Sequence, residues 1–145
     1  MGLDMYLNAK RFLWHNEEEL SNKLTENFPE LGEARVKEVV AEAMYWRKSN
    51  AIHKWFVDNV QAGVDDCGNY DVSREQLQAL LAVITEVLED RKKANTLLPP
   101  QTGFFFGSKD IDDWYWQDLQ NTKQRLEKLL AHEMPGWWFE YHSSW

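Results

Sequence analysis

The chain has 145 residues, of which 43% are hydrophobic and 28% are charged, so we expect a single globular domain, residues 1–145, rather than a disordered segment. Asp and Glu outnumber Lys and Arg by 24 to 16, and the formal net charge is −8. Such a surface repels a phosphate backbone, which argues against a protein that binds duplex nucleic acid.

The first 60 residues are predicted to form a strand followed by helices. Residues 3–14 alternate imperfectly between apolar and other side chains, which favours a strand. Residues 15–42 carry eight acids and three bases, as is typical of a solvated face, and FPELG indicates a turn within them. From Glu33 to Val60 apolar residues recur at helical spacing, so one long helix or two abutting helices are expected.

The second half contains clearer signals for helix boundaries. After a loop at 61–71, Ser73 and Gln76 have the spacing of a capping box that opens a helix, and two prolines follow its end. TGFFFGS predicts a short strand or a turn, and a last helix is expected with Asp110 as its N-cap. The aromatic tail WWFEYHSSW favours a strand paired with the N-terminal one. The predicted fold class is α+β, a mostly helical domain with a small antiparallel sheet from its N- and C-terminal segments.

One segment in the middle of the chain, WRKSNAIHKW, is the main positive patch because it holds several bases and no acid. On a helix, Trp46, Asn50 and His53 would share one face, so an indole, a carboxamide and an imidazole could converge on a planar ligand. Arg47 and Lys54 would supply positive charge for a phosphate group. The alternative is that the tryptophan belongs to the core and that the cations are solvated and paired with nearby acids.

Two further segments could contribute to the same ligand site. Glycine-flanked amides in GFFFGS, with Phe105 for stacking and Lys109 behind it, could bind an anion or a base, although the spacing is not that of a phosphate-binding P-loop. The acids that follow repel phosphate, and the alternative is an aromatic plug that closes the core. The tail would add His142 and Ser143.

Aromatic residues are unusually frequent, with eight tryptophans, five tyrosines and seven phenylalanines. Trp114, Tyr115 and Trp116 are consecutive, and three consecutive helical residues span about 200°, so they cannot all face one core. At least one of them is expected to be exposed or to line a cleft. Several exposed tryptophans together would mark a surface that binds a ligand or a partner.

No pattern in the sequence indicates metal, cofactor or covalent chemistry. The histidines and the single cysteine form no zinc motif, and DDCGNYD lacks the acids of a calcium loop. Cys67 follows two acids, a poor setting for a thiolate nucleophile. Ser143 beside His142 is not a catalytic pair, because adjacent residues of a strand point to opposite faces. No catalytic residue, cofactor or metal is expected, and a binding protein is favoured over an enzyme.

Four motifs together cover most of the chain: MGLDMYL, WRKSNAIHKWFVDNVQAGVDDCGNYDVSREQL, TGFFFGSKDIDDWYWQDL and YHSSW. With them the chain resembles a family of small uncharacterised proteins encoded by bacteriophages and prophages. The resemblance implies a viral protein in the cytoplasm of a host bacterium and transfers no catalytic residues. The single cysteine, the start without a secretory signal and the lack of an apolar run of about 18 residues agree with that location.

Small phage proteins often counter host defence, which suggests two functions by analogy. The first is a sponge that sequesters a nucleotide-type signalling molecule without cleaving it. The second is an acidic inhibitor that uses the carboxylates of residues 15–42 to bind a host defence protein directly. A nucleotide-cleaving enzyme with His53 as general base is a third alternative. A homo-oligomer is expected, and no membrane partner. The predicted ligand-binding residues are Trp46, Arg47, Asn50, His53, Lys54, Phe105, Lys109, His142 and Ser143.

Overall fold

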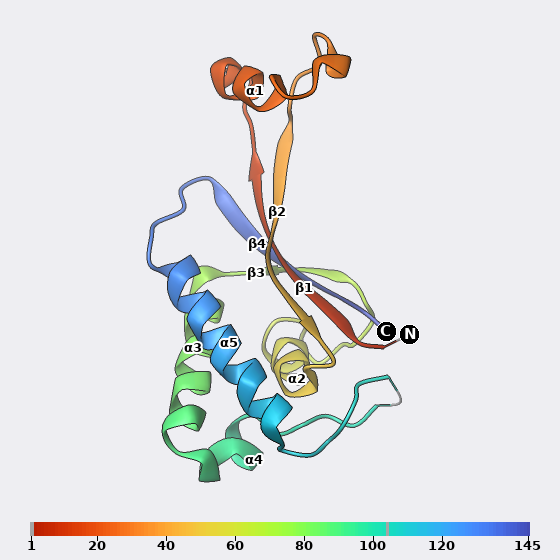
Figure 1. Cartoon of the computed structure of the whole chain (residues 1–145), viewed down its shortest axis with the longest axis vertical. Coiled ribbons are helices and arrows are strands. Elements are labelled where there is room, and N and C mark those ends of the chain that lie inside the picture. The colour runs from red at the N-terminus through yellow and green to blue at the C-terminus, as the bar shows by residue number, and fades with distance from the viewer. Residues whose placement is uncertain (1, 104) are drawn as a thin grey trace.

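A computed structural model describes residues 2–103 and 105–145. A four-stranded antiparallel sheet of order β2-β1-β4-β3 packs against helices (Figure 1). The strands are β1 (Asp4–Phe12), β2 (Glu38–Arg47), β3 (Asn69–Val72) and β4 (Trp137–Ser144). The helices are α1 (Glu18–Thr25), α2 (Asn50–Asn59), α3 (Arg74–Glu89), α4 (Ala94–Leu97) and α5 (Asp113–Leu130), with 3₁₀ turns at Pro29–Leu31 and Arg91–Lys93. The fold is therefore α+β, as predicted.

The centre of the sheet is the pairing of the two terminal strands, which confirms that prediction. β1 and β4 are antiparallel, with Asp4 opposite Ser144 and Arg11 opposite Trp137. Burial alternates along β1, so that Met5, Leu7 and Ala9 face the helices while their neighbours face outward. The sheet is nevertheless larger than expected, because β2 and β3 add one strand at each edge.

The prediction of a continuous helical region from Glu33 to Val60 is wrong, because residues 38–47 form strand β2 and a helix begins only at Asn50. The register between β1 and β2 shifts next to Ala43, where a β-bulge adds one residue to β2. A bulge interrupts the alternation of a strand. The apolar residues of β2 therefore fall at irregular spacings that imitate a helical stripe.

The helix boundaries of the second half agree with the sequence at α3 and differ slightly elsewhere. Ser73 accepts the N–H of Gln76, and the Gln76 side chain accepts the N–H of Ser73, which completes the predicted capping box. The N-cap of α5 is Asp112 rather than Asp110, because the Asp112 carboxylate accepts the N–H of Tyr115 at 3.1 Å. Among the described residues, no helix is both long enough and apolar enough to cross a membrane.

One core joins the sheet to the helices. The rings of Phe56 in α2 and Tyr141 in β4 stack at 3.9 Å between centroids, and both side chains are fully buried. Phe106 is also buried in this core, as the aromatic-plug alternative predicts, and Phe105 packs against it within a turn. Phe104, which belongs to the same predicted motif, lies outside the described residues.

Residues 13–37 connect β1 to β2 and form a small unit that we call the head, seen at the top of Figure 1. Arg35 donates to the backbone oxygens of Leu13 and Trp14, and the hydroxyl of the buried Ser21 accepts the N–H of Val36. The carboxylates of the head lie mostly in solvent, in agreement with the predicted solvated face.

Candidate functional site

A pocket of ≈ 290 Å³ lies where the N-terminal end of α2 meets the start of α5 and the loop before α5. It is lined by Arg47, Lys48, Ser49, Asn50, Ala51, Gly107, Ser108, Asp110, Asp112, Trp114, Tyr115, Asp118 and Leu119. Its volume is near the lower end of the roughly 300–1,000 Å³ of small-molecule sites, and its lining mixes an apolar surface with a few polar groups, as such sites do.

The first side of the pocket is the beginning of α2. The chain leaves β2 through Lys48, which has a positive φ of 55° and whose N–H donates to the backbone oxygen of Leu3 at 2.7 Å. Ser49 is the N-cap, yet its side chain makes no capping hydrogen bond, and the first turn holds no acid. Within the described part of the chain, the N–H groups of Ala51 and Ile52 have no backbone acceptor. These features give this end of the pocket a positive character.

The second side of the pocket is the first half of α5. Asp118 is half-buried, and burial raises the pKa of its carboxyl group above the usual value. The negative charge of Asp112 raises this pKa further, whereas a hydrogen bond with the Ser49 side chain lowers it. The side chain of Asp118 thus places a hydrogen-bond acceptor beside the start of α2.

The pocket also holds an aromatic face and two cations. Trp114 in the first turn of α5 is 74% exposed, so its indole is accessible, and this confirms that one of the three consecutive aromatic residues faces solvent. Arg47 bonds Asp4 at 3.1 Å and stays half-exposed, whereas Lys48 is exposed and has no ion pair among the described residues. An aromatic face beside a cation suits a planar, negatively charged ligand.

Of the nine predicted ligand-binding residues, Arg47 and Asn50 line this pocket. Asn50 is almost fully buried and supports the pocket wall: its amide donates to the backbone oxygens of Phe106 and Ser108, at 3.0 and 2.8 Å, and its oxygen accepts the N–H of Gln101. Asn50 therefore fixes the loop that closes the pocket rather than presenting its amide to a ligand.

The other predicted residues do not line this pocket, and Trp46 lies elsewhere because β2 is a strand and not a helix. Trp46 is buried and donates to the hydroxyl of Thr122 at 2.8 Å. Lys54 pairs with Asp58 at 2.6 Å, in agreement with the alternative interpretation of the patch. Phe105 accepts the N–H of Leu3 through its backbone oxygen, and Lys109 is exposed in the loop before α5. Neighbours on β4 face opposite ways: Ser143 is buried, while His142 packs against Tyr6 on the outer face.

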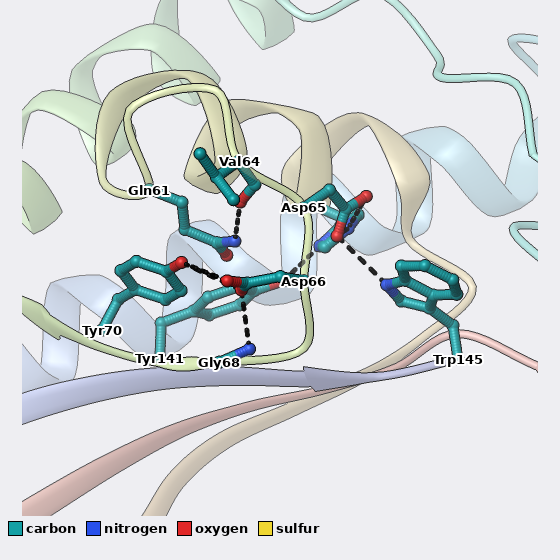
Figure 2. A network of polar contacts seen from close by, with 9 residues as sticks. Gln61, Val64, Asp65, Asp66, Gly68, Tyr70, Tyr141 and Trp145 are labelled. Carbon is teal, nitrogen blue, oxygen red and sulfur yellow. Dashed lines mark hydrogen bonds and ion pairs between the residues drawn. The ribbon is translucent and has the colours of Figure 1, made fainter.

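His53 belongs to a polar network within the core, and Figure 2 labels the other members Asp65, Tyr141 and Trp145. Its Nδ1 lies 2.6 Å from the hydroxyl of Tyr141, and its Nε2 lies 3.0 Å from the carboxylate of Asp65, which also accepts the indole N–H of Trp145 at 3.0 Å. Burial lowers the pKa of His53, although Asp65 opposes this effect. A neutral His53 therefore donates from Nε2 to Asp65 and accepts the Tyr141 proton at Nδ1.

This network is structural. His53 is fully buried in this structure, so its imidazole is not accessible to a substrate, as a general base requires. Within residues 2–103 and 105–145, no three His, Cys, Asp or Glu side chains are grouped closely enough to hold a metal ion.

The sequence does not indicate that Asp118 contributes to a site, nor that Trp114 lines the same pocket as the start of α2. Trp114 was recognised as one of three aromatics of which at least one is exposed, whereas nothing near Asp118 in the sequence links it to Ser49. No family model matches the chain, and no curated protein or solved structure matches it either.

Proposed function

We propose that this protein binds a nucleotide-type small molecule in the pocket between α2 and α5 and sequesters it without cleaving it. The observation that carries the proposal is the division of this pocket into two ends. Arg47, Lys48 and the N–H group of Ala51, which has no backbone acceptor in the described part of the chain, offer positive charge, whereas Asp110, Asp112 and Asp118 place carboxylates on the α5 side. Trp114 supplies an aromatic face on the same wall.

Each part of a nucleotide has a matching group in this pocket. A phosphate group fits the positive end, because backbone N–H groups at a helix start and nearby cations favour anions. A base fits against Trp114, because base–aromatic stacking contributes about 1–3 kcal/mol. The N–H groups of a base fit the acceptor oxygens of Asp118. The small volume favours one nucleotide unit over a larger ligand.

The proposal places this activity in phage counter-defence, in the cytoplasm of a host bacterium, where capture of a signalling nucleotide would prevent its action. This biological setting rests on the resemblance to phage and prophage proteins. Alternatively, the protein is an acidic inhibitor of a host defence protein, which is supported by the exposed carboxylates of the head and by the exposed Trp14, Phe28 and Leu31 beside them.

The pocket is tested by isothermal titration calorimetry with the four ribonucleoside 5′-monophosphates as probes. Trp114→Ala and Lys48→Gln are both expected to weaken binding by about tenfold or more, as loss of one stacking or one charge-assisted contact of about 1.4 kcal/mol would. Trp14→Ala and Lys37→Gln are matched controls, because these exposed residues lie on the head and not in the pocket.

Two results would contradict the proposal. If the unaltered protein binds none of the four nucleotides, or if the head variants weaken binding as much as the pocket variants do, then the pocket is not a nucleotide site. Chromatography of the ligand after incubation tests sequestration separately: intact nucleotide is expected, and cleaved nucleotide would show an enzyme instead.

A further inference from the structure

Strand β2 forms one edge of the sheet. It pairs with β1 along one side, and no strand of the described chain pairs along its other side. β2 has ten residues, and two of its large apolar side chains, Val40 and Tyr45, are 54% and 43% exposed. A long edge strand with exposed apolar side chains is a template for pairing with another strand.

The two exposed apolar residues lie on the same face of the sheet. Val40 is opposite Lys10 and Tyr45 is opposite Tyr6, and both of these β1 residues lie on the outward face, away from Met5, Leu7 and Ala9. In a regular strand, residues five apart would point to opposite faces. The bulge at Ala43 adds one residue between Val40 and Tyr45 and so brings both to the outer face.

This arrangement makes β2 complementary to itself. If two copies of β2 pair antiparallel over their full length, Glu38 lies opposite the partner's Arg47, and Val40 lies opposite the partner's Tyr45. Both pairs occur twice around a two-fold axis, which satisfies the rule for a symmetric interface. Opposite charges and an aromatic–β-branched pair directly across two strands are each stabilising.

Neighbouring registers lack this complementarity. A shift by one residue places Glu42 opposite Glu42 of the partner subunit, which brings like charges together. A shift by five residues from the full-length register places Glu38 opposite Glu42 of the partner subunit, with the same effect. Of these three registers, only the full-length one places no acid opposite another acid, so electrostatic repulsion favours it over the other two.

We infer that two copies of this chain associate through the free edges of β2, in the register that pairs Glu38 with the partner's Arg47 and Val40 with the partner's Tyr45. The sheet then continues across the two-fold axis as eight strands. The bulges at Ala43 interrupt the new ladder at its centre, so each strand contributes two four-residue segments, Glu38–Ala41 and Met44–Arg47. The inference does not require the proposed ligand, because the strand pairing uses the edge of the sheet; Arg47 belongs to this edge and also lines the pocket.

A groove beside the free edge of β2 supports the presence of a partner strand there. The groove lies between residues 42–45 of β2 and α5, and its wall includes Arg125 and Lys128. Neither of these two cations has an ion pair in the described part of the chain. Because Glu42 of the partner subunit lies opposite Ala43 in this register, a second copy along this edge brings a carboxylate toward these cations.

Sedimentation equilibrium of the full chain tests the association. The unaltered protein is expected to be a dimer at micromolar concentration. Val40→Lys is expected to be a monomer at the same concentration, because it adds a charge on the outer face of the interface. Val64→Lys is the matched control, since Val64 is 50% exposed in a loop away from β2, and it is expected to remain dimeric. An unaltered protein that is monomeric up to its solubility limit would overturn the inference.

A charge exchange tests the register. Glu38→Arg is expected to weaken the dimer at least tenfold, because it places two arginines opposite each other. The double variant Glu38→Arg with Arg47→Glu restores the opposite charges and is expected to recover most of that loss. If the double variant associates as weakly as the single one, Glu38 and Arg47 do not face each other and the register is wrong.

Disulfide formation provides an independent measurement of the same register. In a Cys67→Ser background, Val40→Cys with Tyr45→Cys is expected to give a covalent dimer on oxidation. These two positions cannot bridge within one chain, because residues five apart in a strand are roughly 16 Å apart, beyond the reach of a disulfide. Val40→Cys with Ala43→Cys corresponds to a register shifted by two and is expected to remain monomeric on a denaturing gel. Crosslinking of the second pair but not the first would refute the proposed register.

Discussion

The replacement Tyr141→Phe tests the polar network around His53. It removes one hydroxyl group and leaves the ring stacked on Phe56. The Nδ1 atom of His53 then loses its hydrogen-bond donor inside a core where both side chains are fully buried. An unsatisfied buried polar group costs about 1–3 kcal/mol. For a chain of this length that corresponds to a decrease in Tm of roughly 3–12 °C.

Tyr6→Phe is the matched control for this measurement. Tyr6 lies on the outer face of the same sheet, and its hydroxyl has no hydrogen bond among the described residues. Thermal unfolding followed by circular dichroism is expected to show a large decrease for Tyr141→Phe and a small change for Tyr6→Phe. Equal Tm values for the two variants would refute the argument that the Tyr141 hydroxyl satisfies His53.

Three further predictions concern stability and loop order. Burial lowers the pKa of His53 in the folded protein, so below about pH 6.5 the unfolded chain binds a proton that the folded chain does not. The free energy of unfolding, measured by urea titration, should therefore fall as the pH decreases from 6.5 toward 5. A His53→Gln variant with the same pH dependence would contradict this. Ser73→Ala breaks the capping box and is expected to lower the free energy of unfolding by about 0.5–2 kcal/mol in denaturant titrations. Replacement of the exposed Ser144 by Ala should have little effect, and an equal decrease in both variants would argue against the cap. Asn50→Ala removes the amide that donates to the backbone oxygens of Phe106 and Ser108, so amide hydrogen exchange in residues 105–112 should accelerate, and unchanged protection would show that other contacts hold this loop.

Local patterns predicted the elements whose signals are confined to a few residues. The capping box at Ser73 is visible because its two side chains are three residues apart and bond each other. Aromatic and alternating residues identified the two terminal strands. Their pairing could be predicted because the backbone N–H and C=O groups of each strand need a neighbouring strand as hydrogen-bond partner. β2 was mistaken for a helix because the bulge at Ala43 breaks its alternation, and periodicity is the signal by which strands are recognised.

The candidate site was predicted less well, because its walls meet only in three dimensions. Arg47 and Asn50 belong to the patch that the sequence singled out, but Trp46 and Arg47 are neighbours on strand β2 and point to opposite faces, which leaves Trp46 in the core. Asp118 reaches Ser49 from a helix that begins more than 60 residues later. No local spacing encodes that contact, so only the folded chain reveals it.

The central position of β1 and β4 has a consequence for the order of folding. β1 spans residues 4–12 and β4 residues 137–144, so the middle ladder of the sheet joins segments that are far apart in the sequence. The β1–β2 hairpin can form once residues up to 47 have left the ribosome, whereas in the described part of the chain β3 pairs with β4 alone. During translation the second edge of β1 therefore remains unpaired until residues 137–144 have been made. Such long-range closure slows folding and leaves apolar surface open to aggregation in the meantime.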